Sequence, residues 1–116
     1  MIQIKRVYEQ SADEDGYRVL IDRLWPRGLS KEKARVDLWL KEVAPSTELR
    51  KWYHHDTGKW NEFDKRYRKE LRDKKELLKQ IEDLEKEHGT VTLLYGAKDE
   101  EHSQAAVLAK VLKENS

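Results

Sequence analysis

The sequence predicts one α/β domain with a small, mostly parallel sheet flanked by helices. Short apolar, β-branched runs alternate along the 116 residues with longer segments of helical periodicity. Lys and Arg number 24 against 23 Asp and Glu, and four Trp and five Tyr supply core material. A disordered chain of this charge content would have a large net charge and few aromatic residues. No Pro/Gly-rich linker divides residues 1–116, so we expect a single compact domain.

The first half of the chain predicts two strands. Ile2 and Ile4 alternate with polar neighbours up to Val7, which indicates a strand. A polar turn at 11–16 precedes the run 17–21, which is typical of a strand buried on both faces. Pro26 and Gly28 then end regular structure. Ser30 is expected to cap a short helical turn through residue 34, and the run 36–40 fits either a strand or an irregular segment.

The next region predicts two helices. Ser46 is expected to be the N-cap of a helix that carries Leu49, Trp52 and Tyr53 on one face. Asp56 or Thr57 can cap the following helix. Its apolar stripe is Trp60, Phe63, Tyr67 and Leu71.

A further helix, a strand and a last helix complete the pattern. Asp73 with Glu76 resembles a capping box that restarts the helix, and Gly89 is a natural terminator. Residues 91–95 are the clearest strand. Asp99 is expected to cap the last helix, whose apolar positions are Ala105, Leu108, Ala109 and Leu112.

Ligands of open parallel sheets bind beyond the carboxyl ends of the strands, so residues 22–28 and 95–102 are the candidate site. Arg23 and Arg27 can each grip a phosphate or carboxylate, Trp25 can supply a stacking face, and Asp22 lies beside them. The expected partner is a small anion, phosphate- or nucleotide-like. In the structural alternative, Arg23 pairs with Asp22 or Asp37 and Trp25 packs into the core.

Tyr95 and His102 are the candidate catalytic residues if the domain is an enzyme. Histidine is the natural general acid or base near neutral pH, and tyrosine can orient or donate a proton. Glu100 and Glu101 place negative charge beside His102 and would compete with an anion there. A cap or core role for His102 is the alternative.

The sequence 54–56 (His-His-Asp) resembles a metal motif, but adjacent helical residues point about 100° apart. The i, i+4 spacing of helical zinc sites is missing, so no metal site is expected and Asp56 is better explained as a cap. The chain has no cysteine, no P-loop and no dinucleotide fingerprint, so we expect no cofactor.

A basic helix face offers a second function of a different class, a non-catalytic module for nucleic acid or an acidic protein. This face consists of Lys65, Arg68, Lys69, Arg72 and Lys75. A solvated helix surface is its structural alternative. A homodimer formed through exposed tryptophans is a third hypothesis. The chain has no apolar leader and no membrane-length run, so a cytoplasmic location is expected.

Five groups of residues resemble the YeaO-like family. They are RVLIDRLWPRG at 18–28, DLWLK at 37–41 with APS at 44–46, LRKWY at 49–53 with HD at 55–56, WNEF at 60–63 with RY at 66–67, and LLY at 93–95 with Ala97, Asp99 and His102. The resemblance implies a compact α/β domain and no particular reaction. The broader superfamily often has Cys-His-Arg after the last strand, where this chain has Glu101-His102-Ser103, so thiol chemistry does not carry over.

Overall fold

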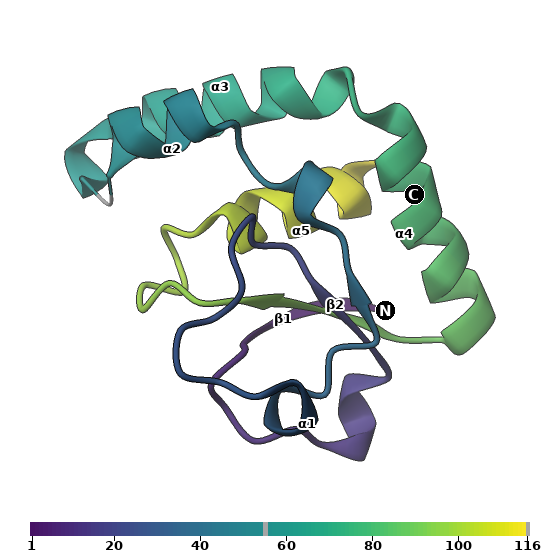
Figure 1. Ribbon diagram of the computed structural model, residues 1–116. Helices are drawn as coiled ribbons and strands as arrows, with labels where there is room; N and C mark the ends of the chain where they lie inside the picture. The colour runs from purple at the N-terminus through teal and green to yellow at the C-terminus, as the bar shows by residue number, and fades with distance from the viewer. Residues whose placement is uncertain (55, 116) are drawn as a thin grey trace.

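The computed structural model describes residues 1–54 and 56–115 and arranges them around a parallel sheet (Figure 1). Within these residues the sheet has four strands, β1 (Ile2–Arg6), β2 (Tyr17–Leu20), β3 (Leu38–Trp39) and β4 (Val91–Tyr95). Their order is β1-β4-β2-β3, and every neighbouring pair is parallel. The predicted α/β class is therefore confirmed, and the ambiguous run 36–40 contains the short edge strand β3.

Most of the helical mass covers one face of the sheet (Figure 1). The helices are α1 (Lys31–Ala34), α2 (Thr47–Tyr53), α3 (Trp60–Arg72), α4 (Lys75–His88) and α5 (Gln104–Glu114). Helix α5 packs on β1 and β4, α3 packs on α5 and α2, and α4 contacts β4 and β2. Helix α1 lies on the opposite side of the sheet. No helix in the described part of the chain combines the length and apolar character needed to cross a membrane.

The main core forms between the sheet and these helices. All five residues of β4, one of the two internal strands, are buried, which explains why its sequence is apolar at every position but Thr92. The predicted stripe on α3 faces this core, with Phe63, Tyr67 and Leu71 all buried. A smaller cluster covers the other face, where Leu20 and Leu94 pack near Trp25 and Trp39.

The predicted serine and glycine caps are confirmed. The side chains of Ser30 and Ser46 accept hydrogen bonds from the backbone N–H groups of Lys33 and Leu49. Asp56 accepts from Gly58 N–H and caps the short 3₁₀ turn before α3, but α3 itself starts after Lys59 without a side-chain cap, so the cap expected from Asp56 or Thr57 does not form on that helix. Gly89 ends α4 with a positive φ of 84°.

Two further predicted caps are wrong. Asp73 closes the end of α3, and α4 starts after Lys74 without a side-chain cap, so the expected capping box does not form. The Asp99 carboxylate accepts from the N–H groups of Glu101 and His102 and closes a turn of its own. This turn ends before α5, which starts at Gln104 with Ser103 as its N-cap residue.

A buried ion cluster ties the amino-terminal part of the sheet to its surroundings. Arg18 on β2 is 4 % exposed and its guanidinium contacts the Asp15 carboxylate. It also donates to the carbonyls of Ala34 (2.8 Å) and Arg35 (3.0 Å). Burial opposes the charge of Asp15, but hydrogen bonds from Ala12 N–H, Lys5 and Arg18 hold the pKa of Asp15 below its usual range.

Candidate anion-binding cleft

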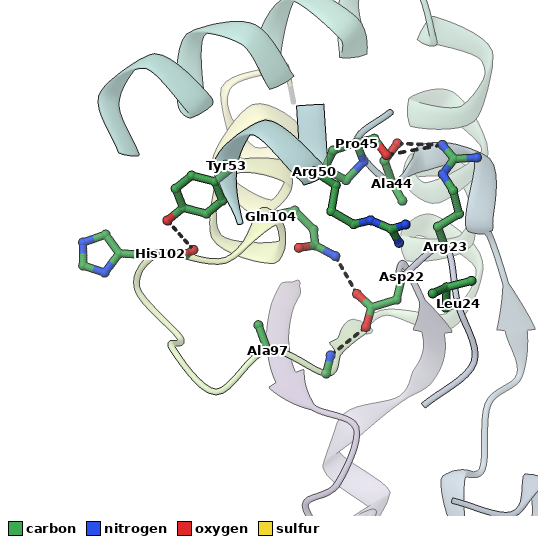
Figure 2. A pocket seen from close by; sticks show the side chains of 11 residues that line it. Asp22, Arg23, Leu24, Ala44, Pro45, Arg50, Tyr53, Ala97, His102 and Gln104 are labelled. Carbon is green, nitrogen blue, oxygen red and sulfur yellow. Dashed lines mark hydrogen bonds between the residues drawn. The ribbon is translucent and has the colours of Figure 1, made fainter. Parts of the chain in front are cut away.

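A cleft of about 250 Å³ opens beyond the carboxyl ends of β2 and β4 (Figure 2). It lies where ligands of parallel sheets are expected to bind. Its lining comes from the loop after β2, the loop before α2, α2 itself, the loop after β4 and the start of α5. The lining residues are Asp22, Arg23, Leu24, Ala44, Pro45, Arg50, Tyr53, Gly96, Ala97, His102 and Gln104.

Asp22 lies at the centre of this cleft and is held by two donors. Its Oδ2 accepts from Gly96 N–H (2.8 Å), and its Oδ1 accepts from Gln104 Nε2 (2.5 Å). Burial raises the pKa of Asp22 to about 6, although Gly96 N–H, Arg50 and Gln104 favour the ionised form. A Cβ at Gly96 would lie 3.1 Å from Oδ2, so a larger residue there would press on the carboxylate.

Two arginines line the cleft together with Asp22. The Arg23 guanidinium donates to the carbonyls of Ala44 (3.2 Å) and Pro45 (3.5 Å). Its Nε is buried without a hydrogen-bond partner among the described residues. Arg50 reaches from α2 toward Asp22, as Figure 2 shows, and acts on the Asp22 pKa through its charge.

The backbone of residues 43–46 forms the wall of the cleft between Arg23 and α2. Side chains of α3 and of Lys74, which follows it, hold this backbone in place. The Tyr67 hydroxyl donates to the Val43 carbonyl (2.8 Å), and Lys74 Nζ donates to the Ala44 carbonyl (2.9 Å). The Glu70 carboxylate accepts from Ser46 N–H (2.8 Å) and from its hydroxyl (2.6 Å). Because Ser46 also caps α2, these bonds determine where that helix places Arg50.

Replacing Tyr67 by phenylalanine tests the importance of this wall. Tyr67 is fully buried, and burial raises the pKa of its phenol, so the hydroxyl stays protonated and donates. The variant leaves the Val43 carbonyl without its donor. We expect the free energy of unfolding to fall by about 1–3 kcal/mol in urea denaturation. A loss no larger than that of Tyr8→Phe, whose ring is 44 % exposed, would contradict this role.

Of the predicted ligand-binding residues, Asp22 and Arg23 line the cleft, while Trp25 and Arg27 do not. The Trp25 indole donates to the Leu29 carbonyl (2.7 Å), and the ring packs against Trp39, with centroids 5.5 Å apart. Arg27 is exposed to solvent outside the lining. Trp25 therefore follows the structural alternative, in which its ring packs against the protein core.

The alternative in which Arg23 pairs with an aspartate is wrong. Arg23 donates to two carbonyls instead. Asp37, one of the two expected partners, accepts from Arg18 N–H (2.8 Å). The backbone carbonyls of residues 44 and 45 therefore take the place of the two aspartates as hydrogen-bond acceptors for Arg23.

The predicted catalytic pair is separated by the structure. Tyr95 is 1 % exposed in the main core and does not line the cleft, and burial raises its pKa to about 12. His102 lines the cleft. Its imidazole bonds to Asp99 (Nδ1 to Oδ2, 2.8 Å) and packs edge-on against Trp60. Figure 2 shows the ring turned away from Asp22. A catalytic role for either residue stays a prediction.

The histidine motif forms no recognisable metal site in the part of the chain that the structure describes. His54 ends α2 in the left-handed region and is exposed, and His55 lies outside the described residues. Among the described residues no group of three or more His, Asp or Glu side chains could hold an ion.

The predicted basic face is partly neutralised by carboxylates. Arg68 bonds to Asp64 (2.7 Å) on the same helix and to Glu114 (2.8 Å) on α5. Lys65, Lys69 and Arg72 remain exposed on α3. A nucleic-acid or acidic-protein interface on this face stays a prediction, weakened by the ion pairs of Arg68.

The tryptophans do not offer the exposed surface that the homodimer hypothesis assumes. All four are half-buried within their own chain. The Trp52 ring, for example, contacts the cationic groups of Lys59 and Arg66, which lie 5.1 and 4.2 Å from its centre. The homodimer itself stays a prediction.

Among the cleft residues absent from the sequence-based candidates, Arg50 and Gln104 are the two whose side chains carry a charge or an amide. Both are polar residues in helices and belong to no local motif. The signal that could have identified Arg50 is its position three residues before Tyr53, because the two then share one face of α2. Gln104 could have been found as the first residue of a helix that follows a strand end.

Fold and cleft together define a small α/β domain with two arginines at the carboxyl edge of a parallel sheet. The family described as the inactive DUF488-N3 subclade matches residues 1–116, and the chain belongs to it. An uncharacterized protein of Mycobacterium tuberculosis (strain H37Rv) is 44% identical over 113 residues, covering 96% of this chain and 92% of that protein. The uncharacterized protein YeaO of Escherichia coli (strain K12) is 44% identical over 112 residues, covering 97% and 96%. The expected YeaO-like resemblance is confirmed. No solved structure matches significantly.

Proposed function

We propose that this protein is a binding domain for a small anion, which Arg23 and Arg50 hold beside Asp22. The observation that carries the proposal is the state of the two guanidinium groups. Arg23 Nε is buried without a partner among the described residues, and Arg50 lines the same cleft without an ion pair to any described carboxylate. Guanidinium groups in this condition suit a carboxylate or phosphate, which supplies the missing acceptors.

The positions of the two residues predicted to be catalytic support a binding role over a catalytic one. The His102 imidazole is engaged by Asp99, and Tyr95 is buried outside the cleft. The family description calls its members inactive. The proposed role therefore assigns recognition of the anion to Arg23 and Arg50 and assigns no step of bond making or breaking.

The test is a calorimetric titration with acetate and with inorganic phosphate, using wild type, Arg50→Gln and Arg27→Gln. Arg50→Gln keeps much of the length and the polarity of the side chain but removes the charge. We expect it to weaken binding of the better anion about tenfold or more, because hydrogen bonds to charged groups contribute about 1.5–3 kcal/mol. Arg27→Gln removes the same charge outside the cleft.

The control decides between a site and a general charge effect. Arg27→Gln is expected to bind within about twofold of wild type, because exposed charges are screened by salt. An equal loss in both variants, or no anion binding by wild type, would contradict the proposed function.

A further inference from the structure

Part of the cleft lining is apolar, and it includes an exposed leucine. Leu24 is 65 % exposed, one of three large apolar side chains exposed in the described part of the chain. It lines the cleft together with Ala44, Pro45 and Ala97. A ligand that carries an apolar body next to its anionic group would remove this surface from water.

The volume of the cleft limits the size of that body. A cavity of about 150 Å³ accommodates benzene, so about 250 Å³ corresponds to about ten non-hydrogen atoms. A nucleotide has a base, a sugar and a phosphate and exceeds this volume. A short-chain or single-ring organic acid fits within it.

The charges of the cleft favour one negative charge on the ligand. The two guanidinium groups of Arg23 and Arg50 and the one carboxylate of Asp22 leave a single positive charge in excess. A monocarboxylate balances this excess. A dianionic phosphate would leave an excess negative charge beside the Asp22 carboxylate, which is unfavourable at low dielectric.

We propose that the ligand is a small organic monocarboxylate, its carboxylate between Arg23 and Arg50 and its apolar body against Leu24, Pro45 and Ala97. This inference rests on the proposed anion site and names the class of molecule that it takes. The juxtaposition of two arginines with an exposed leucine in a cleft of this size carries it.

The test is a calorimetric series of acetate, propanoate, butanoate, pentanoate and hexanoate with the wild-type protein, and with inorganic phosphate beside them. Each added methylene that becomes buried is expected to tighten binding about fourfold, until the cleft is filled. Leu24→Ser is expected to reduce this gain per methylene, and Leu24→Met, a conservative replacement of similar volume, to retain it.

The outcomes separate this inference from the proposed function. Phosphate binding more tightly than every carboxylate would overturn the monocarboxylate, and equal affinity along the series would overturn the buried apolar body. Either result leaves the anion site standing. A gain per methylene that Leu24→Ser leaves unchanged would overturn the placement of the apolar body. If none of these anions binds, both the inference and the proposed function fail.

Discussion

Replacing Arg18 by methionine is expected to lower the free energy of unfolding by about 3–5 kcal/mol, the largest effect that this structure predicts for a single residue. Arg18 is 4 % exposed, and its removal leaves the equally buried Asp15 carboxylate with Lys5 as its remaining cationic partner. The carbonyls of Ala34 and Arg35 lose their donors as well. Urea denaturation followed by tryptophan fluorescence measures the loss.

Two further variants test the cause. Arg72→Met removes an exposed arginine from α3 and is expected to change stability by about 0.5 kcal/mol or less. Combining Arg18→Met with Asp15→Asn should recover part of the loss, because the stranded charge is then gone. A cost for Arg18→Met no larger than for Arg72→Met would show that the buried ion cluster does not contribute in this way.

The same cluster predicts acid sensitivity. The pKa of Asp15 is lower in the folded protein than its ordinary value of 3.8, so folding favours the ionised carboxylate. The corresponding stability is present above pH 3.8 and is lost as the pH falls below it through the folded pKa.

Replacing Asp22 by asparagine is expected to remove a pH-dependent loss of stability that lies in a different range. The pKa of Asp22 is raised from 3.8 to about 6, so the folded state binds this proton more tightly than the unfolded state. The free energy of unfolding therefore decreases as the pH rises from about 4 through about 6, by about 3 kcal/mol in total. The asparagine side chain has no such proton, and the variant should lack this component.

The charged and titratable groups around Asp22 determine how selective this test is. Arg50 on α2 and the neighbouring Arg23 are the cationic side chains that line the cleft with Asp22, and burial raises the pKa of Tyr67 on α3, which therefore stays neutral. His102 also lines the cleft and bonds to Asp99, so the comparison of wild type with Asp22→Asn is repeated in a His102→Gln background.

Anion binding should respond to the same substitution. An ionised Asp22 repels an anion held by the two arginines, so wild-type affinity for acetate should rise about tenfold as the pH falls through about 6. Asp22→Asn should bind tightly at both ends of this range. Asparagine can still accept from Gly96 N–H, and the Gln104 amide can turn to accept from it. Parallel pH profiles for Asp22→Asn and for Asp13→Asn, an exposed carboxylate, would contradict this role of Asp22.

The sequence predicts the sheet and most of the helices because their signals are local. The run 91–95 is apolar at nearly every position and becomes the internal strand β4, and Ser46 caps α2 as expected. The location of the cleft follows from the strand ends, since parallel strands end at one edge. Asp22 and Arg23 are found for this reason.

The rest of the cleft depends on contacts that no local pattern records. Arg50 enters because α2 is docked through Ser46 onto Glu70, 24 residues further along the chain. Trp25 does not line the cleft, because its indole N–H donates to the Leu29 carbonyl within its own loop. Asp99 closes a turn before α5 rather than capping it, which a residue count alone does not reveal.

The sharpest test of an anion site at the carboxyl edge of the sheet is a map of nitrogen-15 NMR shifts during titration with propanoate. We expect changes at Gly96 N–H, at the Gln104 side-chain amide and at Arg50 Nε, which surround the cleft. Arg50→Gln should abolish these changes at the same concentrations. Shifts confined to the basic face of α3 around Lys69 and Arg72, or no shifts at all, would contradict the site.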